Sequence, residues 1–385
     1  MNVLLGMAVL AAVVLGVALA LRAFPALERA VLGDDAPGRF QTMDGLRGLL
    51  ALAVFVHHSI IEQAYCAGSP WAAPAGHFEN FLGRGAVALF FMVSAYLFWG
   101  RLHRAGGRLS WVPFFVERFR RIVPLYAVTT ASLLFIVGVE SGWTLRVPAV
   151  DLLQEASRWF LFGFLGFPDI NGIPDTVTRL SVLWSLRFEW LFYFSLPVLG
   201  MIHARLRRPW VIYTIFVAIG LSGGGKVMFL YFAAGCLCVP ILAGPAVGGR
   251  FQALWAWAGV ACLIAFIWRF HGIEGRVQPW LLIPVFVAAL LGRGPWSVLR
   301  WPPLRYLGHI SYSVYLIHNP LLHVFINAGI GRANYGDLNQ LPLYGVIALM
   351  GCAVMGVATV TYLLVERPCL ASARGVDPSA VSATS

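Results

Sequence analysis

Apolar residues dominate this chain in runs of roughly 15 to 22 residues, and short polar or arginine-rich segments separate the runs. A helix needs about 20 apolar residues to cross a bilayer, so runs of this length predict membrane-spanning helices. We therefore expect an all-α fold, a polytopic transmembrane helix bundle with about 10 to 11 spanning helices. The eleven candidate helices are 2–22, 44–64, 85–100, 122–139, 182–203, 210–223, 226–243, 252–270, 279–292, 308–328 and 341–364.

The composition agrees with lipid as the main solvent of this chain. Hydrophobic residues make up 59% of the 385 residues and charged residues only 12%, whereas a soluble protein of this length needs far more polar surface. The formal net charge is +11, and almost all positive charge is arginine because Lys226 is the only lysine. Such charge in a membrane protein usually faces anionic headgroups, so we expect membrane lipid rather than nucleic acid as a partner.

Arginines follow every second candidate helix, and this alternation predicts the orientation of the chain. Basic loops stay in the cytoplasm, which places the N-terminus outside and the C-terminus inside a multi-pass protein of the inner (plasma) membrane. The segment 140–181 is then the longest outer segment, and we expect its amphipathic part, 151–164, to lie in the membrane interface. The loop arginines are Arg101, Arg104, Arg108, Arg118, Arg120, Arg121, Arg205, Arg207, Arg208, Arg250, Arg293, Arg300, Arg305, Arg367 and Arg374.

The chain divides into one membrane domain with two flanking segments. We expect residues 1–39 to form an extra transmembrane helix and linker, retained rather than cleaved as a signal peptide, because no basic segment and no clear cleavage site accompany the first run. Residues 40–368 form the membrane domain, and residues 369–385 a disordered cytoplasmic tail. The six cysteines lack the spacing of a zinc site or a disulfide framework, and we predict no metal site.

The stretch 44–59 carries polar groups inside an apolar run, with Asp44 and Arg47 at its mouth and His57 and His58 at depth. A charged side chain near the bilayer centre costs at least about 2.5 to 3.5 kcal/mol, which favours a functional site. Arg47 and His58 are eleven residues apart. That spacing places them within about 20° on one helix face and roughly 16 Å apart along the axis, while His57 points about 100° aside. Plain helix packing for the histidines and membrane anchoring for Arg47 stay open as alternatives.

Two further patterns place charge inside or beside the predicted bundle. Arg118 and Arg121 form an R-x-x-R pair on one helix face, so two guanidinium groups can hold one anionic group, although a basic loop can also serve topology alone. Glu189 lies within an apolar run and projects about 200° away from Arg187, so the two do not pair locally. We expect Glu189 to face the bundle interior.

Several uncharged polar residues lie within the same predicted helices. Ser311 and His318 are seven residues apart and share a helix face, where hydrogen bonding between helices is the usual role. Ser94 has no demonstrable base beside it, so we expect a packing role. Trp184 and Tyr193 fit either a platform for a sugar ring or an aromatic belt.

Five patterns, taken in order, resemble the acyltransferase 3 family of integral membrane O-acyltransferases, which put acetyl or other acyl groups on bacterial surface sugars. The patterns are FQTMDGLRGLLALAVFVHHS, GAVALFFMVSAYLF, FFVERFRRIVPLY, LWSLRFEWLFYFSLPVL and LGHISYSVYLIHNPLL, with LLVERP closing the last helix. The resemblance covers residues 40–368. The chain departs from it where Ala86, Ala88 and Ser94-Ala95 replace a glycine, an acidic residue and a Ser-Gly pair, which affects the expected acceptor more than the reaction type.

The resemblance implies roles for the charged residues. The family has arginine and histidine at the separation of Arg47 and His58, which implies that His58 is the general base that takes the proton from an attacking hydroxyl. It also implies that Arg47, Arg118 and Arg121 help bind the phosphates of cytoplasmic acetyl-CoA or another acyl-CoA. Glu189 then orients His58 or holds the acceptor hydroxyl.

We therefore expect an O-acyltransferase, in the first place an O-acetyltransferase, that moves an acyl group from acyl-CoA to a hydroxyl of a cell-surface or exported glycan or glycolipid. The alternative is a multi-span transporter or exporter with an intramembrane His/Glu relay, which predicts repeated halves that the sequence does not show. The expected supporting or substrate-binding residues are Asp44, His57, Ser94, Trp184, Tyr193, Ser311 and His318. The sequence names neither the acceptor glycan nor the acyl chain length.

Overall fold

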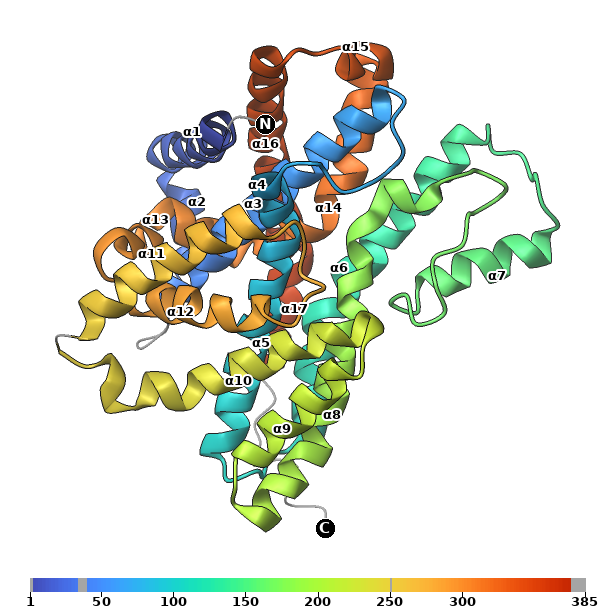
Figure 1. The fold of residues 1–385 in the computed structure, drawn as a ribbon. Helices are drawn as coiled ribbons and strands as arrows, with labels where there is room; N and C mark the ends of the chain where they lie inside the picture. Colours follow the sequence, from blue (N-terminus) through green and yellow to red (C-terminus); the bar gives the residue numbers. More distant parts are fainter. Residues whose placement is uncertain (1–2, 34–39, 250, 375–385) are drawn as a thin grey trace.

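The computed structural model describes residues 3–33, 40–249 and 251–374, and this part of the chain is helical without a β-strand. Figure 1 shows the helices packed into one bundle, with the N-terminal helix at one edge and a helical arm that projects from another. The expected all-α polytopic bundle is confirmed.

The α-helices are α1 (Val3–Ala23), α2 (Pro25–Leu32), α3 (Gln41–Cys66), α4 (His77–Asn80), α5 (Ala86–Arg104), α6 (Trp111–Glu140), α7 (Ala149–Trp159), α8 (Trp184–Leu206), α9 (Trp210–Leu221), α10 (Phe229–Ala243), α11 (Phe251–Arg269), α12 (Gln278–Leu291), α13 (Pro302–His309), α14 (Ser311–Val324), α15 (Arg332–Gly336), α16 (Gln340–Thr361) and α17 (Arg367–Arg374). Short 3-10 or π segments connect them: η1 (Phe81–Gly85), η2 (Thr176–Leu183), η3 (Gly224–Met228), η4 (Pro245–Val247), η5 (Gly294–Arg300), η6 (Phe325–Ile330) and η7 (Tyr362–Glu366).

Seven helices in the described part of the chain are long and apolar enough to cross a membrane, or up to eight if the bent pair α12 and η5 forms one broken span. This number is lower than the 10 to 11 spans expected. The run at 210–223 gives only the 12-residue α9, and the run at 308–328 is divided among α13, α14 and a π segment. The 23-residue α8 carries two charged side chains in its first half. These elements are therefore shorter or more polar than the seven helices that can cross a membrane by length and composition.

The central helix α3 contacts α1, α5, α12, α13, α14 and α16. Its first turns touch the backbone of neighbouring elements directly, since a Cβ on Gly45 would lie 1.8 Å from the carbonyl oxygen of Leu299. On the facing helix α13, a Cβ on Gly308 would lie 1.9 Å from the carbonyl oxygen of Asp44. Small residues are what allow helix backbones to approach this closely in a membrane bundle. The glycines therefore set the position of α3, which carries four of the twelve predicted site residues.

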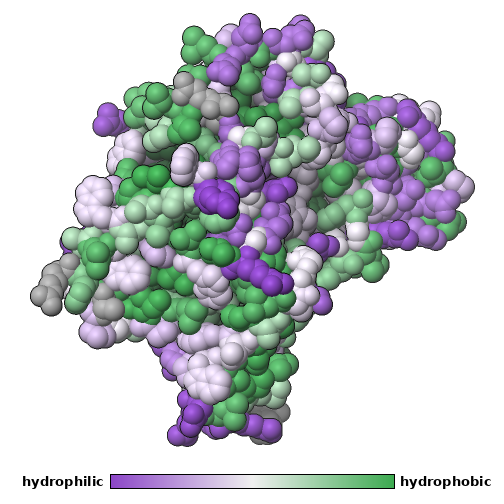
Figure 2. Space-filling model, viewed as in Figure 1, coloured by the Kyte–Doolittle hydropathy of each residue, from purple (hydrophilic) through white to green (hydrophobic). Residues whose placement is uncertain are grey.

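The segment after α6 forms the projecting arm of Figure 1, which contains α7. α7 is amphipathic and leaves Val150 and Leu153 exposed. A helix therefore covers the first part of the expected amphipathic piece at 151–164, while its placement in the membrane interface stays a prediction. Apolar residues also cover large parts of the bundle surface (Figure 2), and on α8 they include Phe194, Val198 and Met201. Lipid is the solvent in which such a surface is stable.

The end of the described chain differs from expectation. Residues 369–374 were assigned to a disordered tail, but they belong to the short helix α17. This helix continues directly from α16 and the π segment η7, and Pro368 lies two residues after that segment. Residues 34–39 of the predicted linker and residues 375–385 of the predicted tail lie outside the described part of the chain.

The close contact of α3 and α13 leads to a stability prediction. We expect Gly308→Ala to destabilise the protein by about 1 to 3 kcal/mol, because the added methyl group meets a backbone carbonyl that has no room to move. Gly356→Ala on α16 is the control, since a Cβ there meets nothing within 4 Å and alanine favours a helix by up to about 1 kcal/mol. Thermal unfolding in detergent measures both variants. Equal midpoints for the two would contradict this account of the contact.

Candidate active site

A cavity of about 780 Å³ lies between α3, α5, α6, α8 and α14. Its size falls within the range of small-molecule and cofactor sites. Seven of the twelve predicted site residues line it: Arg47, Ser94, Arg118, Arg121, Glu189, Tyr193 and Ser311. His57, His58, His318, Asp44 and Trp184 are not among its lining residues.

Arginine dominates the charge of the cavity wall. Arg118 and Arg121 both reach the cavity, which confirms that the R-x-x-R pair shares one face of α6. Arg47 reaches it from α3 and lies 3.8 Å from the carboxylate of Asp44, so Asp44 accompanies Arg47 instead of lining the cavity. The sequence reasoning used Arg367 only as a loop arginine and did not predict it as a fourth arginine of the wall.

Each of two cavity arginines has a partner that holds it in place. Arg121 lies 3.3 Å from the carboxylate of Glu366, whose side chain is 1% exposed. The guanidinium of Arg118 lies 4.6 Å from the centre of the Phe98 ring. Guanidinium groups fixed in this way keep further N–H donors for an anionic ligand, because each has five.

Glu189 faces the cavity from α8, as expected for a carboxylate turned to the bundle interior. Ser94 Oγ on α5 donates to Glu189 Oε1 at 3.3 Å, and the hydroxyl of Tyr193 donates to the same oxygen. Arg187 is exposed on another face of α8, which agrees with the absence of a local pair. Ser94 and Tyr193, rather than His58, are thus the hydrogen-bond partners of Glu189 among the described residues.

His58 and His318 form a hydrogen-bonded pair between α3 and α14. His58 Nδ1 lies 3.0 Å from the carbonyl oxygen of Val54 and 3.1 Å from His318 Nε2. His318 is fully buried, and its Nδ1 lies 2.9 Å from the carbonyl oxygen of Val314. A carbonyl oxygen only accepts, so each Nδ1 carries the proton and each Nε2 keeps a lone pair. The lone pair of His318 therefore accepts from His58, and the Nε2 of His58 is left as a base.

His57 lies edge-on to His58, with ring centroids 5.2 Å apart, but its hydrogen bond goes to another element. Its Nδ1 lies 2.7 Å from the carbonyl oxygen of Glu79, and a Cβ on Gly83 would lie 2.2 Å from its ring. His57 thus packs against α4 and η1. Trp184 likewise packs edge-on against Phe91, with ring centroids 6.5 Å apart.

The cavity ends beside the histidine pair at Ser185 and Tyr315, two residues that the sequence reasoning also missed. Both line the cavity, and their hydroxyl oxygens lie 2.7 Å apart. The ring of Tyr315 lies 6.3 Å from that of His318, measured between centroids. Tyr315 therefore connects the wall of the arginine-lined cavity to the histidine pair. Ser311, also on the wall, donates to the carbonyl oxygen of Gly308 at 2.8 Å.

Comparisons with known proteins show the family of this chain. A family model described as an acyltransferase domain matches residues 40–363. Peptidoglycan O-acetyltransferase OatA of Listeria monocytogenes is 25% identical over 325 residues, which cover 73% of this chain and 49% of the relative. Putative peptidoglycan O-acetyltransferase YrhL of Bacillus subtilis is 27% identical over 340 residues, with 73% and 48% covered. O-acetyltransferase OatA of Staphylococcus aureus is 22% identical over 397 residues, with 90% and 59% covered.

The chain thus spans about half the length of the curated relatives it matches. No solved structure matches it significantly.

Proposed function

This chain belongs to the acyltransferase family whose model matches residues 40–363, and we propose that it is an inner-membrane O-acetyltransferase. In this proposal it moves the acetyl group of cytoplasmic acetyl-CoA to a hydroxyl of a cell-surface or exported glycan or glycolipid. The single observation that carries the proposal is an arginine-lined cavity that ends beside a histidine with a free Nε2.

The cavity suits the two parts of an acyl-CoA. Its phosphates need cations, and Arg47, Arg118 and Arg121 supply fixed guanidinium groups at the wall. Its pantetheine arm needs an apolar channel, which Phe90 and Leu97 help to line. Glu189, held by two hydrogen bonds on the same wall, faces the donor, and we assign it the positioning of the donor arm.

The chemistry follows from the free nitrogen of His58. The acceptor oxygen attacks the thioester carbonyl carbon while His58 Nε2 takes the hydroxyl proton. The carbonyl reforms, the C–S bond breaks, and the departing sulfur of CoA takes the proton back from the imidazolium. For the thioester to reach His58, the hydrogen bond between Ser185 and Tyr315 opens. Base assistance of this kind contributes about 10²- to 10⁴-fold.

The acceptor in this proposal is a glycan. Two relatives are named for peptidoglycan, so the hydroxyls of peptidoglycan are the first acceptor to test.

Donor binding can be measured without the acceptor. We expect coenzyme A to raise the unfolding temperature of the purified protein, and we expect Arg47→Gln with Arg118→Gln to abolish most of this rise because two phosphate ligands are removed. Arg121 is left in place, since its loss would strand the buried Glu366. A matched control, Arg158→Gln with Arg187→Gln, removes the same charge from exposed positions outside the cavity. No rise for the wild-type chain at millimolar coenzyme A, or equal rises for both double variants, would count against the proposal.

The base is tested in cells by mass spectrometry of envelope glycans. We expect His58→Ala to remove the acetyl increment that the wild-type chain adds in a deletion strain, while the protein still reaches the membrane. His271→Ala is the control, and we expect it to retain transfer because His271 is exposed and does not line the cavity. Unchanged acetylation with His58→Ala would refute the assigned role.

Two substitutions distinguish the hydrogen bond that His318 accepts from His58 from the bond that anchors His318 to its own helix. Glutamine at 318 keeps a polar group at the place of Nε2, whereas asparagine keeps only the group that bonds the carbonyl of Val314. If His318 acts by accepting from His58, we expect His318→Gln to keep more activity than His318→Asn, with a lower kcat and an unchanged KM for acetyl-CoA. Greater activity of the asparagine variant would show that only the anchor to α14 matters.

A further inference from the structure

We propose that Glu62 of α3 and Asn319 of α14 form a binding site for a neutral, hydroxyl-rich acceptor on the side of the His58–His318 pair away from the donor cavity. This inference rests on the proposed function, and it adds the place and chemistry of acceptor recognition.

Polar side chains continue along both helices beyond the histidine pair. Glu62 lies one helical turn after His58, so it shares the same face of α3. Asn319 directly follows His318 on α14. Arg47 at the donor cavity and Glu62 are fifteen residues apart on α3, which is roughly 22 Å along the axis. Donor and acceptor would therefore approach His58 from opposite ends of one helix.

Both residues are buried, and Asn319 has a buried donor atom without a hydrogen-bond partner among the described residues. Asn319 is 2% exposed, and its Nδ2 has no hydrogen-bond partner, while its Oδ1 accepts from Ser181 Oγ at 3.4 Å. Glu62 is 4% exposed and makes no hydrogen bond to any described residue. Buried polar groups in native proteins are nearly always satisfied, so the unpartnered amide donor of Asn319 indicates a missing ligand. Glu62, one turn after His58 on α3, offers that ligand an acceptor.

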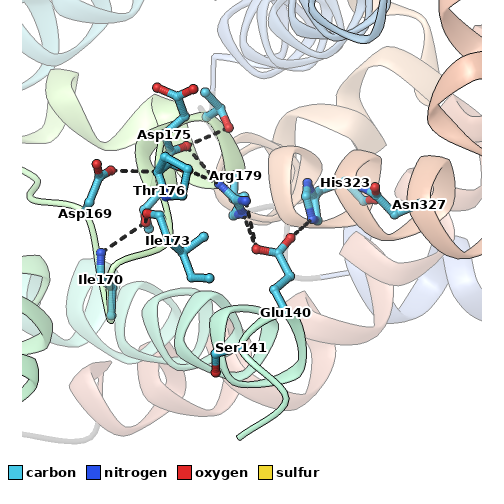
Figure 3. Close-up of polar contacts among 12 residues, drawn as sticks. Glu140, Ser141, Asp169, Ile170, Ile173, Asp175, Thr176, Arg179, His323 and Asn327 are labelled. Carbon is cyan, nitrogen blue, oxygen red and sulfur yellow. Dashed lines mark hydrogen bonds and ion pairs between the residues drawn. The ribbon is translucent and has the colours of Figure 1, made fainter. Parts of the chain in front are cut away.

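The charged neighbours of Glu62 are already engaged with other groups. His323, Arg332 and Arg179 are its electrostatic neighbours. Figure 3 shows that Arg179 and His323 both point to Glu140, with Arg179 Nη2 at 2.8 Å and His323 Nε2 at 2.7 Å from its carboxylate oxygens. The guanidinium of Arg332 lies over the Tyr65 ring, 4.9 Å from its centre. The network thus supplies Glu140 with two donors and leaves Glu62 for another molecule.

The chemistry of the two groups identifies the class of ligand. A carboxylate accepts a hydrogen bond and an amide N–H donates one, and a hydroxyl group can do both at once. Neighbouring hydroxyls of a sugar ring meet this pair of requirements, whereas a phosphate would be repelled by Glu62. Tyr65 and Trp71, with ring centroids 5.6 Å apart, offer aromatic surface beyond the same end of α3.

The test compares acetyl transfer to glycans with two measurements that need only the donor, the binding of coenzyme A and the hydrolysis of acetyl-CoA. Glu62→Met and Asn319→Leu remove the hydrogen-bonding groups at similar size, and Glu62→Gln keeps part of them. We expect acetyl ester on envelope glycans of the deletion strain to fall about tenfold or more for the first two variants and less for Glu62→Gln. The rise in unfolding temperature with coenzyme A, and the slow hydrolysis of acetyl-CoA by water, should match the wild type, because neither needs the acceptor.

A control in η6, the segment that follows α14, is Asn327→Leu. Asn327 is exposed and donates to the carbonyl oxygen of His323, so we expect wild-type transfer from this variant. Full transfer by Glu62→Met or Asn319→Leu would overturn the proposed site, and so would a parallel loss of transfer, coenzyme A response and hydrolysis. Failure of the wild-type chain itself to bind coenzyme A or to acetylate glycans would instead overturn the proposed function on which this inference rests.

Discussion

The surrounding lipid offers no hydrogen bonds, so each polar group in this bundle needs a partner inside the protein. The paired imidazoles of His58 and His318 show how the chain meets this constraint. Each ring is anchored through Nδ1 to a carbonyl oxygen four residues earlier on its own helix, and the two rings meet at 3.1 Å. The arrangement satisfies three ring nitrogens and leaves one, His58 Nε2, for chemistry. The hydrogen bonds that satisfy these buried nitrogens also fix the orientation of the His58 ring, the proposed base.

The packing of glycine supports the same geometry. Gly45 and Gly308 bring α3 against its neighbours at backbone contact, and Gly83 leaves space for the ring of His57. These backbone contacts fix the position of α3. In that position Arg47 lines the cavity and His58 contacts His318 on α14. The arginines of α6 are likewise fixed before any ligand arrives, by the Glu366 carboxylate and the Phe98 ring. Preorganised groups of this kind bind a charged donor with less loss of side-chain entropy.

Sequence periodicity predicted the all-α bundle and much of the cavity, because helix faces follow from residue spacing alone. The shared face of Arg118 and Arg121 and the inward direction of Glu189 are examples. Contacts between distant segments did not follow in this way. His58 and His318 are 260 residues apart, and the spacing of residues within one helix does not indicate which residue of another helix it contacts. Glu189 was therefore considered as the group that orients His58, a position that His318 occupies. The uncharged Ser185 and Tyr315, which line the cavity, carried no charge signal. Seven or eight helices of the described chain meet the length and hydropathy expected of a full span, because several of the shorter apolar runs form short or bent helices.

The central claim is that a donor in the arginine-lined cavity presents its acyl group to His58. The most direct measurement is an experimental structure of the protein with a hydrolysis-resistant acyl-CoA analogue. We expect the phosphates at Arg47, Arg118 and Arg121, the Ser185–Tyr315 contact opened, and the acyl carbon next to His58 Nε2. An analogue bound outside the cavity, or one bound inside it with its acyl end directed away from the histidine pair, would contradict this account.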